Sequence, residues 1–177
     1  MKTKFLFTIY LLIVLVPLRA QNYHVCDQEA LNKSITRCSK PYKVLYIFCT
    51  YCHPAKYNMY LDSLVSQHHS DSIAFFPITC QNTEEVLPYI VKHDIKNFIY
   101  FVKTKKNGKR IGMFVFDNPI KQACEVLERY DSTHIENVGA GGYIILDENN
   151  RPIMWSDFKE RKYSQDFMLL RNFILAH

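Results

Sequence analysis

Two cysteines separated by two residues, Cys49 and Cys52, are the side chains of this sequence best suited to chemistry. They follow a strongly apolar run, Val44 to Phe48, and precede a segment with helical spacing that starts near Pro54. A helix N-terminus presents unpaired N–H groups and a partial positive charge, which stabilise a thiolate. A second cysteine nearby can resolve the mixed disulfide that the thiolate forms. The motif therefore predicts thiol–disulfide chemistry.

Three other interpretations compete for the same residues. Cys49-Thr50-Tyr51-Cys52-His53 matches the c-type haem attachment motif, but a haem domain is mostly helical and this chain has several β-rich runs. Zinc would use the two cysteines with His68 or His69, without a second Cys-x-x-Cys in support. A peroxiredoxin needs Pro-x-x-x-Thr-x-x-Cys, whereas the threonine here stands two residues before the cysteine. We therefore expect neither a metal nor a bound cofactor.

Alternating strand-like and helix-like segments surround the motif and predict an α/β fold. The predicted strands cover 43–48, 72–79, 98–102, 111–116, 143–146 and 152–155. The predicted helices cover 54–67, 82–93, 119–130 and 164–175. Asn107-Gly108, between two apolar runs, predicts a hairpin that joins the third and fourth strands. This order indicates an α/β sandwich built around a mixed sheet.

The chain from about residue 40 to 175 resembles the thioredoxin-like proteins of bacterial envelopes, of the redoxin and alkyl hydroperoxide reductase/thiol-specific antioxidant type. Two segments carry the resemblance: Val44 to Lys56, and Tyr143 to Asp147 with the turn and strand that follow. It implies a thioredoxin-like fold, with a central mixed sheet flanked by helices. It also implies an oxidoreductase that acts on protein or peptide thiols and disulfides, together with an unidentified redox partner.

The resemblance has two registers, which assign the cysteines differently. In one register, Cys49 and Cys52 are the family's Cys-x-x-Cys pair, and Cys49 attacks. In the other, which we favour, residues 51–56 match Trp-Cys-x-Pro-Cys-Lys, so that Cys52 attacks, Tyr51 is the preceding aromatic residue and Pro54 is the motif's proline. Ala55 then stands in the position of the resolving cysteine, and Cys49 becomes a candidate substitute.

A second departure from the family lies just before the strand at 143–146. The family usually places there a cis-proline that faces the active cysteine, whereas this chain has Gly141-Gly142. The resemblance assigns these glycines to substrate binding, together with Tyr51 and Pro54. Since both a cysteine and a proline of the family pattern are missing, the alternative is a redox-inactive binding module with a thioredoxin fold.

The other cysteines and the charge add little functional signal. An even count of six cysteines in an oxidising compartment allows disulfides, and we predict a structural one between Cys26 and Cys38. Cys80 and Cys124 are expected to be buried free thiols. The basic run 103–110 is typical of a solvated turn, so no nucleic-acid surface is indicated.

The first twenty residues have the pattern of a secretory signal. Lys2 and Lys4 precede an apolar run, Phe5 to Leu18, and a small residue, Ala20, ends the segment. The run has about 14 residues, whereas a membrane span needs roughly 20. We therefore divide the chain into a signal (1–20), an N-terminal lead (21–40) and a thioredoxin-like domain (41–177). The mature protein, with no membrane span, would reach the periplasm or the extracellular space.

Removal of the signal is open to direct measurement. Intact-mass analysis of the protein from the envelope or secreted fraction should show a chain that begins close to Gln21. Loss of the signal's basic residues would lower the formal net charge from +5 to +2, because residues 1–20 carry three basic and no acidic side chains. A full-length product in the cytoplasm would contradict the assignment.

Overall fold

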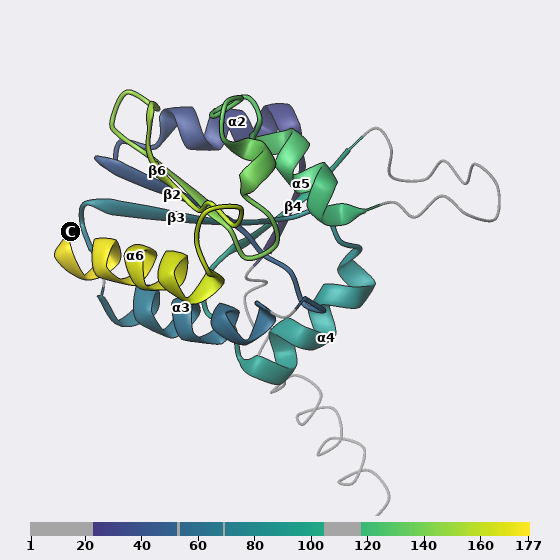
Figure 1. The fold of residues 1–177 in the computed structure, drawn as a ribbon. Helices are drawn as coiled ribbons and strands as arrows, with labels where there is room; N and C mark the ends of the chain where they lie inside the picture. Colours follow the sequence, from purple (N-terminus) through teal and green to yellow (C-terminus); the bar gives the residue numbers. More distant parts are fainter. Residues whose placement is uncertain (1–22, 53, 69, 105–117) are drawn as a thin grey trace, which may run out of the picture.

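A computed structural model describes residues 23–52, 54–68, 70–104 and 118–177, which form a mixed sheet between two layers of helices (Figure 1). The described strands are β1 (Tyr23–Asp27), β2 (Tyr42–Ile47), β3 (Ile73–Thr79), β4 (Ile99–Lys103), β5 (Tyr143–Leu146) and β6 (Pro152–Trp155). The described helices are α2 (Gln28–Arg37), α3 (Ala55–His68), α4 (Thr83–His93), α5 (Pro119–Leu127), the short η1 (Ile135–Asn137) and α6 (Tyr163–Ala176). The predicted α/β fold class is confirmed.

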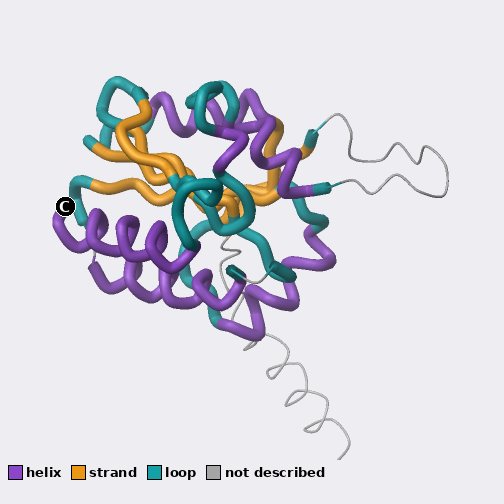
Figure 2. The backbone as a smooth tube through the Cα atoms, in the orientation of Figure 1, coloured by secondary structure: helices purple, strands orange, loops and turns teal. Residues whose placement is uncertain are grey.

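The six strands of the described sheet have the order β1-β4-β3-β2-β5-β6. The first four in this order pair in parallel, whereas β5 runs antiparallel to β2 and β6 antiparallel to β5. Helices α2 and α5 cover one face, and α3, α4 and α6 cover the other; Figure 2 shows helices on both sides of the strands. Alternate side chains of each strand therefore enter two separate cores.

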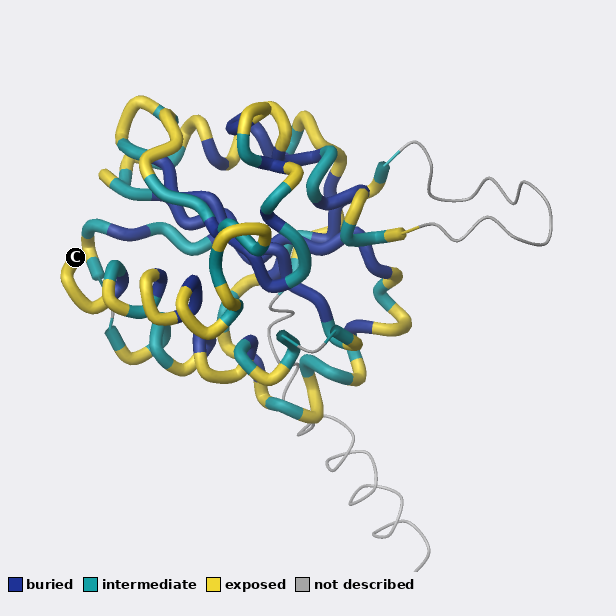
Figure 3. The backbone as a smooth tube through the Cα atoms, viewed as in Figure 1, coloured by how far each residue is buried: buried dark blue, intermediate teal, exposed yellow. Residues whose placement is uncertain are grey.

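Strand β2 lies inside this sheet and carries the apolar run of the sequence. Its residues from Val44 to Ile47 are each at most 1% exposed, and the strand is drawn as buried in Figure 3. A continuous apolar run is what a strand covered on both faces requires, because neither row of side chains meets water. Lys43 is also buried, and its ammonium donates to the carbonyl oxygens of Asp147 and Glu148 at 3.2 Å each.

The other predicted elements are found within a few residues of their expected bounds. The largest difference is in α5, which ends at Leu127 and not at Tyr130. The predicted signal, the Asn107-Gly108 turn and the predicted strand 111–116 lie outside the described residues. Strand β4, the expected first half of that hairpin, pairs with β1 on one side and β3 on the other.

Residues 23–37 form a strand and a helix that the sequence analysis did not predict. β1 pairs with all five residues of β4, and Asp27 caps α2 by accepting from the N–H of Ala30 at 2.8 Å. The apolar residues Leu31 and Ile35, one helical turn apart, are fully buried against the sheet. Much of the predicted lead therefore packs as part of the same fold.

Substitutions in α2 measure how much this segment stabilises the fold. Leu31→Ala should lower the free energy of unfolding by about 3 kcal/mol, because it leaves a cavity in a closed core. Lys33→Ala, on the exposed side of the same helix, should change it by less than about 0.5 kcal/mol. Urea denaturation followed by circular dichroism gives both values. Equal stabilities of the two variants would show that α2 is dispensable to the core.

Candidate functional site

The two cysteines of the motif are joined in the structure. A disulfide links Cys49 to Cys52, with the two Cα atoms 6.1 Å apart. Both residues lie in the connection between the end of β2 at Ile47 and the start of α3 at Ala55. Because the strand ends two residues before Cys49, the chain can turn and bring the two sulfurs together.

The two bonded cysteines differ in their access to solvent. Cys49 is 2% exposed, whereas Cys52 is only partly buried. Tyr51, beside Cys52, is 60% exposed. A large molecule that approaches this loop therefore meets Cys52 and Tyr51 before it can meet Cys49.

Buried amide side chains hold the loop at Cys49 and Thr50. The Gln81 amide oxygen accepts from the Thr50 N–H at 2.9 Å, and its nitrogen donates to the Thr50 hydroxyl at 3.0 Å. The Asn58 amide nitrogen donates to the Cys49 carbonyl at 2.8 Å, and its oxygen accepts from the Tyr46 hydroxyl at 2.8 Å. These bonds satisfy backbone groups that leave the sheet at this point. The sequence analysis did not identify Gln81 or Asn58, because their partners are set by the tertiary fold.

The two predicted glycines lie directly beside this loop. The Gly141 N–H donates to the Ile47 carbonyl at 3.0 Å, and the Ile47 N–H donates to the Gly142 carbonyl at 2.9 Å. Gly141 has a φ of 70°, and a Cβ added there would lie 2.6 Å from the Pro54 Cβ and 2.5 Å from the Tyr163 hydroxyl oxygen. Only glycine fits this conformation and this space without a shift of its neighbours.

A shallow depression of about 600 Å³ lies beside Pro54. Pro54 and Ala140 form one side, and the residues between Phe158 and Tyr163 form the other. The Tyr163 hydroxyl donates to the Gly141 carbonyl at 3.1 Å, which ties the two sides together. The sequence analysis did not predict this depression.

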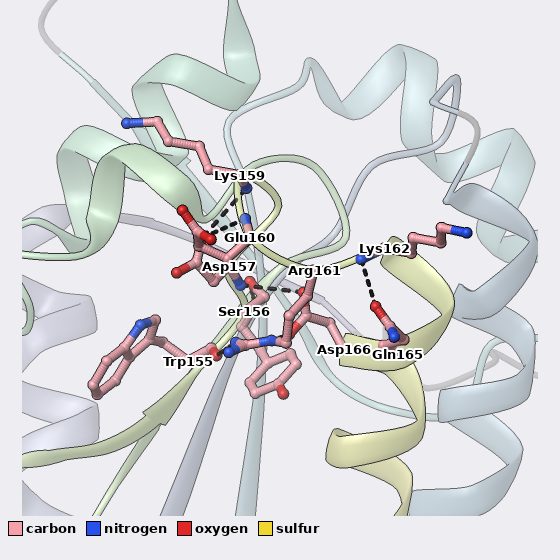
Figure 4. A network of polar contacts seen from close by, with 10 residues as sticks. Trp155, Ser156, Asp157, Lys159, Glu160, Arg161, Lys162, Gln165 and Asp166 are labelled. Carbon is pink, nitrogen blue, oxygen red and sulfur yellow. Dashed lines mark hydrogen bonds and ion pairs between the residues drawn. The ribbon is translucent and has the colours of Figure 1, made fainter.

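A polar network stiffens the wall formed by the residues before α6 (Figure 4). The Arg161 guanidinium donates to the buried Asp166 carboxylate at 2.6 Å and to the Trp155 carbonyl at 2.6 Å. The Asp157 N–H donates to the other oxygen of Asp166 at 3.2 Å, and the Asp157 carboxylate accepts from the N–H groups of Lys159 and Glu160. The wall therefore keeps its shape through bonds to buried groups, and the Lys159 and Lys162 ammonium groups stay outside the bonds drawn there.

The structure does not join the predicted Cys26–Cys38 pair, and both thiols are free. Asp27 and the ten residues of α2 separate the two cysteines, and the helix is about 15 Å long, whereas a disulfide needs Cα atoms within roughly 7 Å. Cys80 and Cys124 are also free, as predicted; Cys80 is buried as expected, whereas Cys124 is only partly buried. Burial raises the pKa of Cys26 and Cys124 to about 11 and that of Cys80 to about 12, so these thiols stay protonated at neutral pH.

The described residues give little support to the zinc and haem interpretations. No group of three metal-ligating side chains gathers within them, although His69 of the zinc interpretation lies outside them. The six-stranded sheet is unlike the mostly helical domain that covalent haem attachment suggests. Within the same residues, no helix has the length and apolar content needed to cross a bilayer.

Comparison with known proteins supports the fold. No protein-family model matches the chain, and no curated protein matches its sequence. Among solved structures, a proposed protein disulfide isomerase from Bacteroides thetaiotaomicron matches with a TM-score of 0.51 and 12% identity, over 82% of this chain and 79% of that one.

Two further solved structures match with lower TM-scores. StoA from Bacillus subtilis has a TM-score of 0.49 and 15% identity, over 77% of this chain and 84% of its own. A thiol:disulfide interchange protein of the thioredoxin family from Chlorobium tepidum TLS has a TM-score of 0.49 and 12% identity, over 81% and 84%. Taken with the strand order and the position of the cysteine pair, the Bacteroides match shows that this chain has a thioredoxin-like fold.

Proposed function

We propose that the chain is a thiol–disulfide oxidoreductase in which Cys52 attacks the substrate and Cys49 resolves the mixed disulfide. The observation that carries the proposal is the Cys49–Cys52 disulfide, which joins one buried and one accessible cysteine at the end of the central strand. A pair of this kind separates the two roles. The accessible sulfur can meet a substrate, and the buried sulfur is held within reach of it.

The reaction is two thiol–disulfide exchanges. In the reduced protein, the Cys52 thiolate attacks one sulfur of a substrate disulfide and releases the other as a thiolate. Cys49, once deprotonated, then attacks the Cys52 sulfur, so that the Cys49–Cys52 bond forms and the second substrate thiol leaves. The substrate gains two electrons and two protons overall, and an external dithiol, the unidentified redox partner, must reduce the pair again.

The start of α3 supports the choice of Cys52 as the attacking thiol. Cys52 stands three residues before the first residue of this 14-residue helix, and its carbonyl accepts from the Ala55 N–H at 2.8 Å. The partial positive charge at the helix N-terminus favours a thiolate there over a thiol. Ala55 itself has no group that could resolve a mixed disulfide, so this step falls to Cys49.

The surroundings of Cys52 support a peptide substrate. Exposed Tyr51 precedes Cys52 in the chain, and the nearby Pro54 ring lines the depression and lies against Gly141. The name of the Bacteroides structure, a disulfide isomerase, is consistent with protein or peptide disulfides as substrates. The N-terminal signal pattern supports a location of this chemistry in the periplasm or outside the cell.

One observation favours a second candidate, a redox-inactive binding module. Ala55 and Gly141-Gly142 replace a cysteine and a proline of the pattern that the sequence resembles. In that case the disulfide would only stiffen the loop, and the depression beside Pro54 would bind a partner without chemistry.

An insulin-reduction assay with dithiothreitol separates the two candidates. The wild-type protein should accelerate the precipitation of insulin, and Cys52→Ser should lower the rate by about 100-fold or more, because no first exchange can occur. Cys38→Ser is a matched control, since that thiol is partly buried but lies away from the disulfide, and it should keep the wild-type rate.

Trapping identifies the resolving thiol. With a disulfide-bonded peptide, Cys49→Ser should accumulate a stable mixed adduct at Cys52 that the wild type does not retain, which mass mapping detects. Equal adduct levels in the two proteins would contradict resolution by Cys49. A wild-type protein that does not reduce insulin, together with a Cys49→Ser variant that forms no adduct, would favour the binding module.

A further inference from the structure

The end of β3 runs alongside the loop that carries the disulfide. Ile47 pairs with Ile78 in the parallel ladder, and the Phe48 N–H continues it by donating to the Ile78 carbonyl at 2.8 Å. Two residues further on, the Thr50 N–H donates to the Gln81 side chain at 2.9 Å. The segments 48–50 and 79–81 therefore stay side by side past the end of β2.

This register places a free thiol next to Cys49. Counting two residues on from the Ile47/Ile78 pair gives Cys49 on one segment and Cys80 on the other. Neighbouring strands lie about 4.8 Å apart, within the Cα separation of roughly 4.4 to 6.8 Å that a disulfide requires.

The alternation of side chains along the two segments predicts both cysteines on the same face of the sheet. Ile47, Ile78 and Cys80 pack in the core under α2 and α5, and side chains repeat their direction every second residue. Phe48 packs in the opposite core, so the alternation continues past Ile47 and predicts Cys49 on the side of Ile47. Cys49 is 2% exposed and Cys80 is 6% exposed, so water and large thiols are kept from both.

We propose that Cys80 is a third thiol of the redox site. By intramolecular exchange it can replace Cys52 as the disulfide partner of Cys49. The proposal rests on the redox role of the Cys49–Cys52 pair. The Cys80 sulfur, after losing its proton, attacks the Cys49 sulfur. The Cys49–Cys52 bond breaks as the Cys49–Cys80 bond forms, and Cys52 leaves as a thiolate that can take up that proton. The exchange needs no outside oxidant, because one disulfide replaces another.

The consequence is a second oxidised form of the protein. Its disulfide lies inside the sheet, and Cys52 is a free, accessible thiol that can form mixed disulfides without a resolving partner. Burial is the largest of the effects that raise the pKa of the Cys80 thiol to about 12. The nearby Cys124 and Cys26 thiols contribute smaller effects in the same direction. Few Cys80 thiols are deprotonated at neutral pH, so we expect this exchange to be slower than the proposed cycle of Cys52 and Cys49.

Disulfide mapping of Cys52→Ser tests the proposal. The variant is oxidised with diamide, a small membrane-permeant oxidant, then quenched in acid, alkylated and mapped by mass spectrometry without reduction. The expected product is the peptide of Cys49 linked to the peptide of Cys80. The link should be lost in Cys52→Ser/Cys80→Ser and kept in Cys52→Ser/Cys26→Ser, because Cys26 is also a buried thiol of that core but lies on β1, beyond β4.

A folded Cys52→Ser protein, by circular dichroism, in which Cys49 remains a free thiol or links elsewhere would overturn the proposal. If that variant does not fold, the disulfides of the wild-type protein are mapped instead. After long incubation of the oxidised protein, a Cys49–Cys80 link with alkylated Cys52 should be present, and its absence overturns the proposal.

The insulin assay separates this inference from the proposed function. An active wild type without the link removes only this inference, and an inactive wild type with the link removes only the proposed function.

Discussion

The hydrogen bonds on both edges of β2 fix the position of everything in the site. β3 pairs with one edge in parallel and β5 with the other edge in antiparallel, so the C-terminal end of β2 emerges between the end of one neighbour and the start of the other. The last residue, Ile47, uses its N–H and its carbonyl on Gly142 and Gly141. The cysteine loop must therefore leave the sheet between these glycines and the end of β3, where Gln81 meets Thr50.

This position gives the two cysteines different environments. Cys49 follows directly after the buried strand, and its carbonyl is held by Asn58, so its sulfur remains inside. Cys52 comes after the turn and just before α3, where the chain meets solvent and the helix N-terminus favours negative charge. A Cys-x-x-Cys motif that starts two residues after a strand thus places its first cysteine inside the fold and its second cysteine nearer the surface. The proposed roles, attack by Cys52 and resolution by Cys49, follow from this difference, and they leave no chemical role for the position after Pro54, which is Ala55.

Much of this arrangement could be predicted from the sequence. The apolar run Val44 to Phe48 indicated a fully covered strand, because that signal is local, whereas the position of Gly141-Gly142 beside the motif came from the family resemblance. Whether the sulfurs of Cys49 and Cys52 meet depends on the residue at which β2 ends. A shift of that end by one residue could keep the two sulfurs apart. β1 was missed because its five residues, YHVCD, lack a regular apolar alternation, and their pairing with β4 joins segments far apart in sequence. The contacts of Gln81 and the wall around Arg161 likewise need the tertiary fold.

The difference in reactivity between Cys52 and Cys49 is the central claim, and limited alkylation measures it most directly. The reduced, folded protein is treated at neutral pH with less than one equivalent of iodoacetamide, and the labelled cysteine is identified by peptide mass mapping. The account predicts that the label appears on Cys52 and that Cys49 and the thiols in the core remain unlabelled. A label that appears on Cys49 first, or on Cys52 no faster than in the unfolded chain, would contradict it.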